Sequence, residues 1–295
     1  MKKLPVLLFF LFPLCAQAQK TTPVDLNTVY AFIDSTTYLK LFENPFVRDT
    51  LFECVSKSSK TNTDTYGGKY MFGQSSLLEF MRPGGAQSFG PDGFGSVGIE
   101  FTTRALHDLT TYVKIADQHK IATQVDSIVL NKPDGTKVKW HVDFGMKDDK
   151  NYSASHFFNI AIIEYEKDYL SSVGLTASEL ARPLELKKIR NSRSGHEENY
   201  TKQFSTISRV DVTVDSVELK KLEDMMKIMG FAKKGSQYRK DGITIAYQLN
   251  TNNSYRLNRV EVNLLNKMPE RDIVVSDHLR IQTKGNKADL IFKYN

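Results

Sequence analysis

The chain has 295 residues, of which 40% are hydrophobic and 25% charged, and its formal net charge is +6 at pH 7. A chain of this length can bury a sizeable core, as one large domain or two smaller ones. The positive excess is small and no basic run alternates with aromatic residues, so the composition argues against a nucleic-acid partner.

The first 18 residues have the features of a secretory signal peptide. Two lysines precede an apolar run over 4–15, and the small residues Ala16 and Ala18 have the spacing of a cleavage site. The run is too short to cross a bilayer, although an uncleaved anchor is the alternative. We therefore expect an exported protein, periplasmic or secreted, with no membrane association after cleavage.

Cys54 would be the only cysteine left after cleavage, so no internal disulfide can form. It lies in a predicted strand over 51–57, which favours a buried structural thiol over a reactive one.

A first unit of the pattern strand, helix and three strands is predicted over about 26–83. Alternating apolar residues predict a strand over 26–33, and Asp34 is a suitable cap for a short helix that ends before Pro45. The remaining strands are predicted over 51–57, 66–73 and 75–81.

A glycine-rich connection over 84–95 leads to a second unit of the same pattern, over about 95–166. Its first strand covers 95–102 and its helix 104–120. Lys132-Pro133-Asp134-Gly135 predicts a tight turn. The strands around and after this turn are expected over 125–130, 136–144 and 157–165.

Residues 167–206 are charged and are predicted to be a linker, with a short helix near 184–190. The third unit is predicted over 207–295. Its first strand ends in Asp215, which forms a capping-box pattern with Glu218, and the helix that follows ends at Gly230. Its strands are expected over 231–238, 243–249 and 256–264, followed by a hairpin of 278–283 and 288–293 that turns at 284–286.

The first strands of the three units share an alternation of faces. Side chains alternate across a strand, so the apolar positions belong under a helix and the others face the opposite side. The apolar sets are Val29/Ala31/Ile33, Val97/Ile99/Phe101 and Val210/Val212/Val214. The opposite sets are Thr28/Tyr30/Phe32, Ser96/Gly98/Glu100 and Arg209/Asp211/Thr213. A polar inner face on repeated units predicts a curved sheet that cups a ligand.

Five stretches of the sequence, given below, resemble the vicinal-oxygen-chelate superfamily of glyoxalase-like proteins. In particular, the chain is similar to an uncharacterised family of exported bacterial members. The resemblance implies an α+β fold in which two paired βαβββ units form a cupped mixed sheet over 26–166, followed by a third similar unit. The stretches that carry it are 26–34, 66–82, 95–103, 132–140 and 157–165.

In this superfamily a divalent metal is often held in the cup by a first-strand histidine and a last-strand glutamate from each unit. The resemblance places the glutamates at Glu79 and Glu164, with Glu261 at a similar place in the third unit. The histidine positions fall on Thr28, Ser96 and Arg209. We therefore expect no His-based metal site, although carboxylates and hydroxyls could hold Mg²⁺ or Ca²⁺.

Glu79 and Glu164 are the candidate catalytic residues. Two carboxylates that converge in one cup can raise each other's pKa and make one of them a base, whereas salt bridges or solvated strand ends are the alternative. The candidate ligand-binding residues are Thr28, Tyr30, Phe32, Tyr70, Ser96 and Glu100. The aromatic members of this set could stack on a ligand or fill the core.

His141 and Asp143 would share one face of a strand, as an oriented base or as a pair on the sheet surface.

Three functions remain open from the sequence, and none of them specifies a cofactor. The first is an exported protein that binds a small organic ligand in the cup without the usual metal site. The second is a metal-assisted lyase, isomerase or dioxygenase that uses Glu79 and Glu164. The third is a non-catalytic interaction module. The third unit would either pair with a copy of itself in a homodimer or dock beside the first two.

Overall fold

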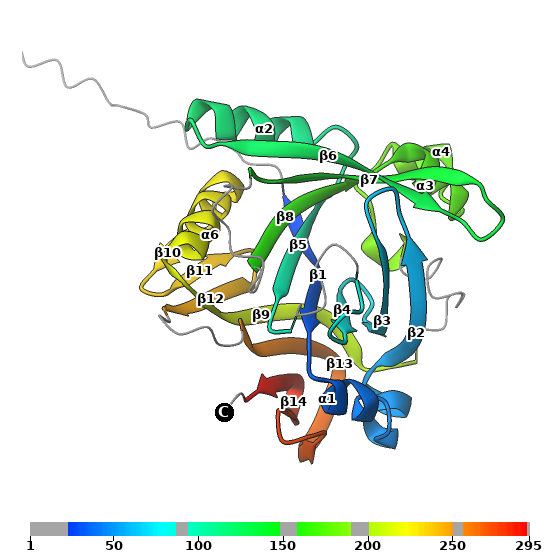
Figure 1. The fold of residues 1–295 in the computed structure, drawn as a ribbon, viewed down its shortest axis with the longest axis vertical. Coiled ribbons are helices and arrows are strands. Elements are labelled where there is room, and N and C mark those ends of the chain that lie inside the picture. The colour runs from blue at the N-terminus through cyan, green and yellow to red at the C-terminus, as the bar shows by residue number, and fades with distance from the viewer. Residues whose placement is uncertain (1–22, 87–93, 148–157, 190–200, 250–255, 294–295) are drawn as a thin grey trace, which may run out of the picture.

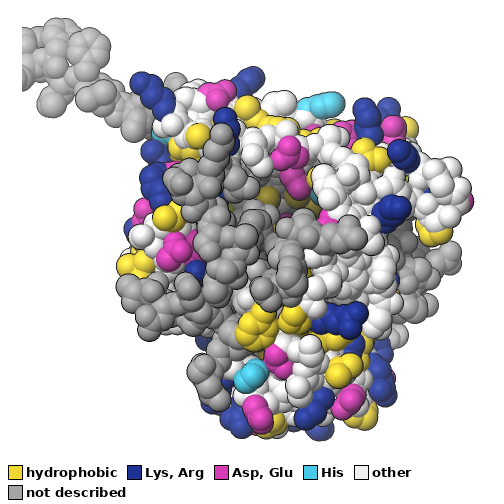
Figure 2. Space-filling model, in the orientation of Figure 1, with side chains coloured by type: hydrophobic (Ala, Val, Ile, Leu, Met, Phe, Trp, Pro, Cys, Tyr) yellow, Lys and Arg dark blue, Asp and Glu magenta, His cyan; other side chains and the backbone are white. Residues whose placement is uncertain are grey.

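The computed structural model describes residues 23–86, 94–147, 158–189, 201–249 and 256–293. The predicted signal peptide lies outside these ranges. Within them, none of the helices is both long and apolar enough to span a bilayer. Charged side chains of both signs are mixed over the face shown in Figure 2.

The first two units form one eight-stranded mixed sheet with the strand order β2-β3-β4-β1-β5-β8-β7-β6. The first unit contains β1 (Val24–Phe32), α1 (Ser35–Lys40), the helical turn η1 (Phe46–Leu51), β2 (Glu53–Lys60), β3 (Thr65–Phe72) and β4 (Leu77–Met81). The second contains β5 (Val97–Thr103), α2 (Leu109–Gln118), β6 (Thr123–Asn131), β7 (Lys137–Met146) and β8 (Phe158–Tyr165).

Strand pairing confirms the paired βαβββ architecture. The first and last strands of each unit are parallel, β1 with β4 and β5 with β8, and antiparallel pairing of β1 with β5 joins the units at the centre of the sheet. This is the glyoxalase-like α+β fold that the resemblance implies (Figure 1).

Local signals in the first two units match the structure closely, except at the start of β2 and in α2, which covers Leu109–Gln118 where a helix over 104–120 was predicted. The Asp34 carboxylate caps α1 by accepting a hydrogen bond from the Thr37 amide at 2.8 Å, and Gly135 takes the positive φ of +84° that its turn requires. The strand predicted from residue 51 starts at Glu53, because 46–51 form a helical turn. Cys54 is half-buried in β2, and burial raises the pKa of its thiol to about 12, which suits a structural role.

The third unit repeats the pattern in a six-stranded sheet ordered β10-β11-β12-β9-β13-β14. The unit contains β9 (Phe204–Val214), α6 (Ser216–Met229), β10 (Ala232–Lys234), β11 (Gln237–Lys240) and β12 (Ile243–Leu249). Again the first and last strands, β9 and β12, are parallel. The capping box of Asp215 and Glu218 is present, and Gly230 ends α6 with a φ of +73°, as the sequence predicts.

The predicted C-terminal hairpin is wrong. Residues 279–292 form one strand, β14 (Leu279–Phe292), which pairs with the long strand β13 (Leu257–Val274). Gly285, expected in a turn, lies opposite Met268 where the register of the two strands shifts, and its φ is +61°. A glycine at a β-bulge has the same local composition as a glycine in a turn, so the sequence signal is ambiguous.

The segment predicted as a linker is folded over its described part. It contains α3 (Lys167–Ser172) and α4 (Ala177–Leu180). Tyr169 and Leu170 are buried in a cluster with Trp140 and Tyr165 of the eight-stranded sheet, and the Tyr165 and Tyr169 rings stack at 5.7 Å. This segment therefore buttresses β7 and β8 instead of spanning open space.

The third unit docks on the outer face of the larger sheet (Figure 1). Apolar residues of both sheets belong to one continuous core, which includes the predicted helix-facing sets of all three first strands. Aromatic pairs mark the junction: Phe52 with Phe204 at 5.4 Å, Phe80 with Phe292 at 5.9 Å and Phe101 with Phe231 at 5.5 Å. Docking thus covers the apolar outer face and leaves the polar inner face to the site.

Candidate functional site

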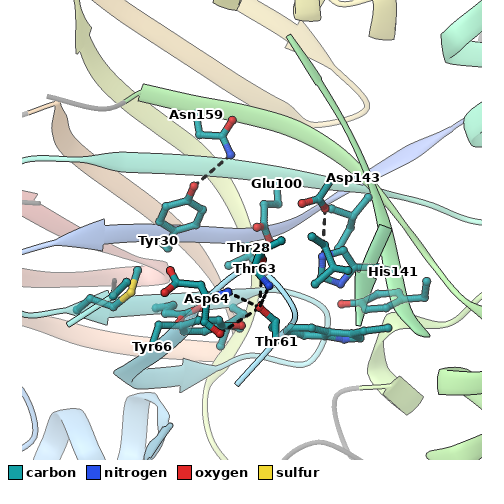
Figure 3. A pocket seen from close by; sticks show the side chains of 18 residues that line it. Thr28, Tyr30, Thr61, Thr63, Asp64, Tyr66, Glu100, His141, Asp143 and Asn159 are labelled. Carbon is teal, nitrogen blue, oxygen red and sulfur yellow. Dashed lines mark hydrogen bonds and ion pairs between the residues drawn. The ribbon is translucent and has the colours of Figure 1, made fainter. Parts of the chain in front are cut away.

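A cavity of about 190 Å³ lies on the inner face of the eight-stranded sheet (Figure 3). Its polar lining is Thr28, Tyr30, Thr61, Thr63, Asp64, Tyr66, Glu79, Glu100, His141, Asp143 and Asn159. Its other walls are Leu77, Met81, Ala86, Ile128, Trp140, Ile163 and Tyr165. Both units contribute, which is what pairing around β1 and β5 predicts.

Strand register places one carboxylate on each side of β1. Tyr30 lies opposite Glu79 of β4, and Thr28 lies opposite Glu100 of β5. Directly paired residues point to the same side of a sheet, so all four side chains face the cavity. Of the predicted site residues, the structure therefore brings Thr28, Tyr30, Glu79 and Glu100 together.

Tyr30 forms the floor between the two units. Its ring lies over Gly98, where a Cβ atom would come within 1.9 Å of the ring. Its hydroxyl accepts a hydrogen bond from Asn159 Nδ2 at 3.1 Å. Burial raises the pKa of Tyr30 well above its usual value, and the negative charge of Glu100 raises it further. The hydrogen bond from Asn159 lowers the pKa but does not offset these two effects. Tyr30 is therefore a neutral phenol that can donate a hydrogen bond.

His141 and Asp143 share one face of β7, as predicted, and this face lines the cavity (Figure 3). His141 Nε2 lies 3.1 Å from Asp143 Oδ1, close enough for an ion pair but poorly aligned for a hydrogen bond. The His141 residue is only 8% exposed. Its other nitrogen, Nδ1, is buried and has no hydrogen-bond partner in the described part of the chain. The pair is thus part of the cavity wall and not of the sheet surface.

Glu164 does not join Glu79, and the expectation that they converge is wrong. Its carboxylate accepts hydrogen bonds from the amides of His107 at 2.8 Å and Leu109 at 2.9 Å, at the start of α2. Ile163 and Tyr165, its neighbours in β8, line the cavity, so Glu164 points to the opposite face. Residues 160–163 are apolar on both faces of β8, and this removes the alternation that would have shown the orientation.

Phe32, Tyr70 and Ser96 do not line the cavity. Phe32 is fully buried in a cluster with Tyr30 and Met81, and Tyr70 is 1% exposed and stacks on Phe72. Ser96 is also buried. The structure therefore supports the alternative in which these residues fill the inner face beside the site.

Sequence reasoning missed the loop that closes the cavity. The segment 61–64 follows β2 at one edge of the sheet and binds β6 at the other edge. The Asn62 amide donates to the Val129 carbonyl at 3.0 Å, and Asn131 Nδ2 donates to the Thr61 carbonyl at 2.8 Å. These contacts bring Thr61, Thr63 and Asp64 to the cavity. A pairing between residues almost seventy positions apart leaves no local signal.

Trp140, Asn159 and Tyr165 were also missed as lining residues. Trp140 and Tyr165 flank His141, with ring centroids 4.5 and 6.3 Å from the imidazole. The only available signal was the alternation of Trp140 with the polar residues of its strand, which does not distinguish a cavity wall from a core.

The donor set does not fit the His-based metal site of the superfamily. Thr28 and Ser96 occupy the histidine positions, and Glu164 serves the start of α2 instead of the cup. In the described ranges, no group of three or more His, Cys, Asp or Glu side chains is arranged to hold a metal ion.

Solved structures of similar fold are distant in sequence. A Mn(II)-bound glyoxalase from Novosphingobium aromaticivorans is 10% identical, with a TM-score of 0.38 over 90% of this chain and 81% of that one. The 2,3-dioxygenase LapB from Pseudomonas sp. KL28 is 10% identical, with a TM-score of 0.38 over 93% and 94%.

A xylose isomerase-like TIM barrel/4-hydroxyphenylpyruvate dioxygenase fusion protein is also 10% identical, with a TM-score of 0.41. The match covers 83% of this chain and about a third, 36%, of that longer one. No curated protein matches the sequence. A family model, described as a family of unknown function (DUF5829), matches residues 26–292. The chain therefore belongs to the DUF5829 family.

Proposed function

We propose that this protein binds a small organic ligand in the cavity between its first two units. The observation that carries the proposal is the polar lining of an interior space. Thr28 and His141 are each at most 8% exposed, and polar groups in an interior lower stability unless they serve an interaction. A core-filling role would favour apolar residues at these positions.

The size and shape of the cavity suit a small metabolite. Its 190 Å³ is more than ten times the roughly 10–15 Å³ that a cavity needs to hold one water molecule. Aromatic walls from Tyr66, Trp140 and Tyr165 surround a few polar groups, which is the usual composition of a small-molecule site. The alternative in which Glu79 and Glu164 act together on a metal-bound substrate lacks its second carboxylate.

Trp140 offers a direct test, because it is the only tryptophan of the chain and lines the cavity. A screen of small neutral and charged fragments should find compounds that change Trp140 fluorescence and raise the melting temperature. Thr28→Phe should abolish binding by filling the cavity, whereas Thr28→Val, of nearly unchanged volume, should retain it. If Thr28→Phe does not fold, Ile163→Phe takes its place.

The opposite result would support an interaction module. In that case no fragment moves the fluorescence of Trp140, or a fragment binds Thr28→Phe and the parent protein equally.

The export predicted from residues 1–18 is part of the same proposal. Its support is the charged, apolar and small-residue pattern of the N-terminus. Expression of the full chain in a Gram-negative host should yield a periplasmic or secreted product whose N-terminal residue is Gln19. A cytoplasmic product that keeps Met1 would contradict it.

A further inference from the structure

We propose that the ligand of this cavity is a small ring compound with a hydroxyl or N–H group that donates a hydrogen bond to Nδ1 of His141. This inference rests on the proposed ligand-binding function and specifies the chemical class of the ligand.

The first argument is the place of His141 in the cavity wall. Strand β7 lies between β6 and β8, where His141 pairs with Ile128 on one side and Tyr165 on the other. Directly paired residues point to the same side of a sheet, and all three line the cavity. Because strands on both sides hold its backbone, His141 has a fixed position in the site, at 8% exposure.

The Asp143 carboxylate determines which nitrogen of His141 carries the proton. Asp143 lies two residues further along β7, and its Oδ1 is 3.1 Å from Nε2 (Figure 3). A proton on Nε2 faces the carboxylate favourably, whereas a lone pair on Nε2 would face a negative charge. The carboxylate therefore favours the tautomer with the proton on Nε2, in which Nδ1 presents a lone pair.

The second argument is that two buried acceptor atoms of this wall lack a hydrogen-bond donor in the described ranges. They are Nδ1 of His141 and Oδ1 of Asp143, whose contact with Nε2 is too poorly aligned to count as a hydrogen bond. On the neighbouring strand β8, by contrast, the Glu164 carboxylate accepts two amide hydrogen bonds. Buried polar atoms are nearly always hydrogen-bonded, so the wall selects a ligand that donates to it.

The third argument is the pair of aromatic rings beside the imidazole. The rings of Trp140 and Tyr165 both lie edge-to-face with His141, at centroid distances of 4.5 and 6.3 Å, and both residues line the cavity. A ligand whose donor reaches Nδ1 therefore lies near these rings. Flat rings pack well on aromatic side chains, so we infer a ring compound rather than a flexible chain.

Two probes of nearly equal size isolate the donor: benzyl alcohol, and ethylbenzene, in which a methyl group replaces the hydroxyl. Their affinities are measured at pH 7 by Trp140 fluorescence, and the ratio of the two is compared between proteins. His141→Leu, which has no acceptor, should shift this ratio toward ethylbenzene by about tenfold or more. His141→Asn should shift it less, because its amide oxygen can replace Nδ1. The control is His119→Leu, at an exposed position after α2, which should leave the ratio unchanged.

A measurement on the parent protein does not depend on the folding of these variants. In ¹⁵N NMR spectra, His141 is identified by its contacts with the Trp140 and Tyr165 rings. The spectra should show a proton on Nε2 and none on Nδ1. Addition of benzyl alcohol should move the Nδ1 signal toward that of a hydrogen-bonded nitrogen, and ethylbenzene should not.

The outcomes separate this inference from the proposed function. An unchanged affinity ratio in folded His141→Leu, or a proton on Nδ1 in the parent protein, overturns the inference while ligand binding stands. It is also wrong if the fragments that bind in the screen have neither a hydroxyl nor an N–H group. If neither probe binds and the fragment screen finds no binder, the proposed function itself fails.

Discussion

The eight-stranded and six-stranded sheets are built from the same unit, in which the first and last strands pair in parallel around a connecting helix. Their polar faces differ. In the first sheet, the polar face holds a cavity with carboxylates, an imidazole and aromatic rings. In the second, it carries ion pairs within β9 and between β13 and β14, which we call the ion-pair ladder.

The ladder balances charge residue by residue. Arg209 contacts Asp211 at 2.6 Å, and Arg259 contacts both Asp289 at 2.8 Å and Glu261 at 3.2 Å. The Arg259–Asp289 pair joins neighbouring strands, where opposite charges stabilise the pairing of a sheet, and the other pairs balance charge within a strand. Glu261, which the resemblance places at the ligand position of the third unit, is therefore a structural residue of this ladder.

Enclosure also distinguishes the two sheets. The first pairs two complete units, and its edges meet where 61–64 binds β6. The third unit is paired instead with β13 and β14, two antiparallel strands without a helix between them. A partner of this kind completes the sheet but does not close a cup. The comparison teaches that the unit supplies a fold, whereas a site needs two units and a closing loop.

The largest expected effect is a loss of stability when a buried ion pair of the third unit is broken. Arg256 is 2% exposed and pairs with the buried Glu218 of α6, and burial raises the pKa of Glu218. Arg256→Met would leave a buried carboxylate without its cation, so the free energy of unfolding should fall by about 3–5 kcal/mol in urea titrations.

The control substitution is on α6, the helix that carries Glu218. Lys220→Met removes an exposed pair with Asp224 and should cost only about 0.3–0.5 kcal/mol. Equal effects of the two substitutions would show that the buried pair is not a support of the third unit.

The second prediction concerns the floor of the cavity. Gly98→Ala puts a methyl group into the space of the Tyr30 ring, and strain of this kind typically costs about 1–3 kcal/mol. Gly145→Ala, in β7 of the same sheet, meets nothing closer than 3.9 Å and should be nearly neutral. Melting temperatures of both variants measure the difference; similar values would place Tyr30 elsewhere than over Gly98.

The third prediction separates Glu164 from the cavity. Glu164→Ala removes the acceptor at the start of α2 and should lower the free energy of unfolding by about 0.5–2 kcal/mol, as loss of a helix cap does. Because Glu164 faces away from the cavity, the affinity for a fragment that binds there should not change. A loss of affinity without a loss of stability would show that Glu164 takes part in ligand binding.

The smallest effect is a pH dependence where the third unit meets α1. Asp34 contacts His278 Nδ1 at 3.0 Å, and although burial raises its pKa, hydrogen bonds from Thr37 and His278 lower it below its usual value of 3.8. A lowered pKa stabilises the fold above 3.8, and this contribution is lost as the pH falls through the folded value.

Asp34→Asn should therefore lower the melting temperature at pH 7, and the difference from the parent protein should shrink below pH 4. The exposed Asp117→Asn serves as the control. A difference that stays constant down to pH 2 would show that Asp34 acts through its shape and not its charge.

The elements with strong local signals could be predicted from the sequence. Alternation in the first strands identified the inner face of Thr28, Tyr30 and Glu100, and the capping box of Asp215 fixed the start of α6. Such signals need only neighbours in the chain.

The rest depended on contacts between distant residues or on ambiguous patterns. The orientation of Glu164 was hidden by an apolar strand, and Gly285 marks a bulge with the composition of a turn. The contribution of Asp64 depends on the pairing of 61–64 with β6, which local pattern cannot reveal. The site was therefore half predictable: its floor and one carboxylate on each side of β1, but not its closing loop or its aromatic wall.

A crystal structure of the protein soaked with the tightest-binding fragment of the screen tests the central claim most directly. The account predicts electron density for the fragment between Tyr30, Glu100 and Trp140, and none on the ion-paired face of the third unit. A cavity filled by the protein's own side chains, or a probe bound only at the ladder, would contradict it.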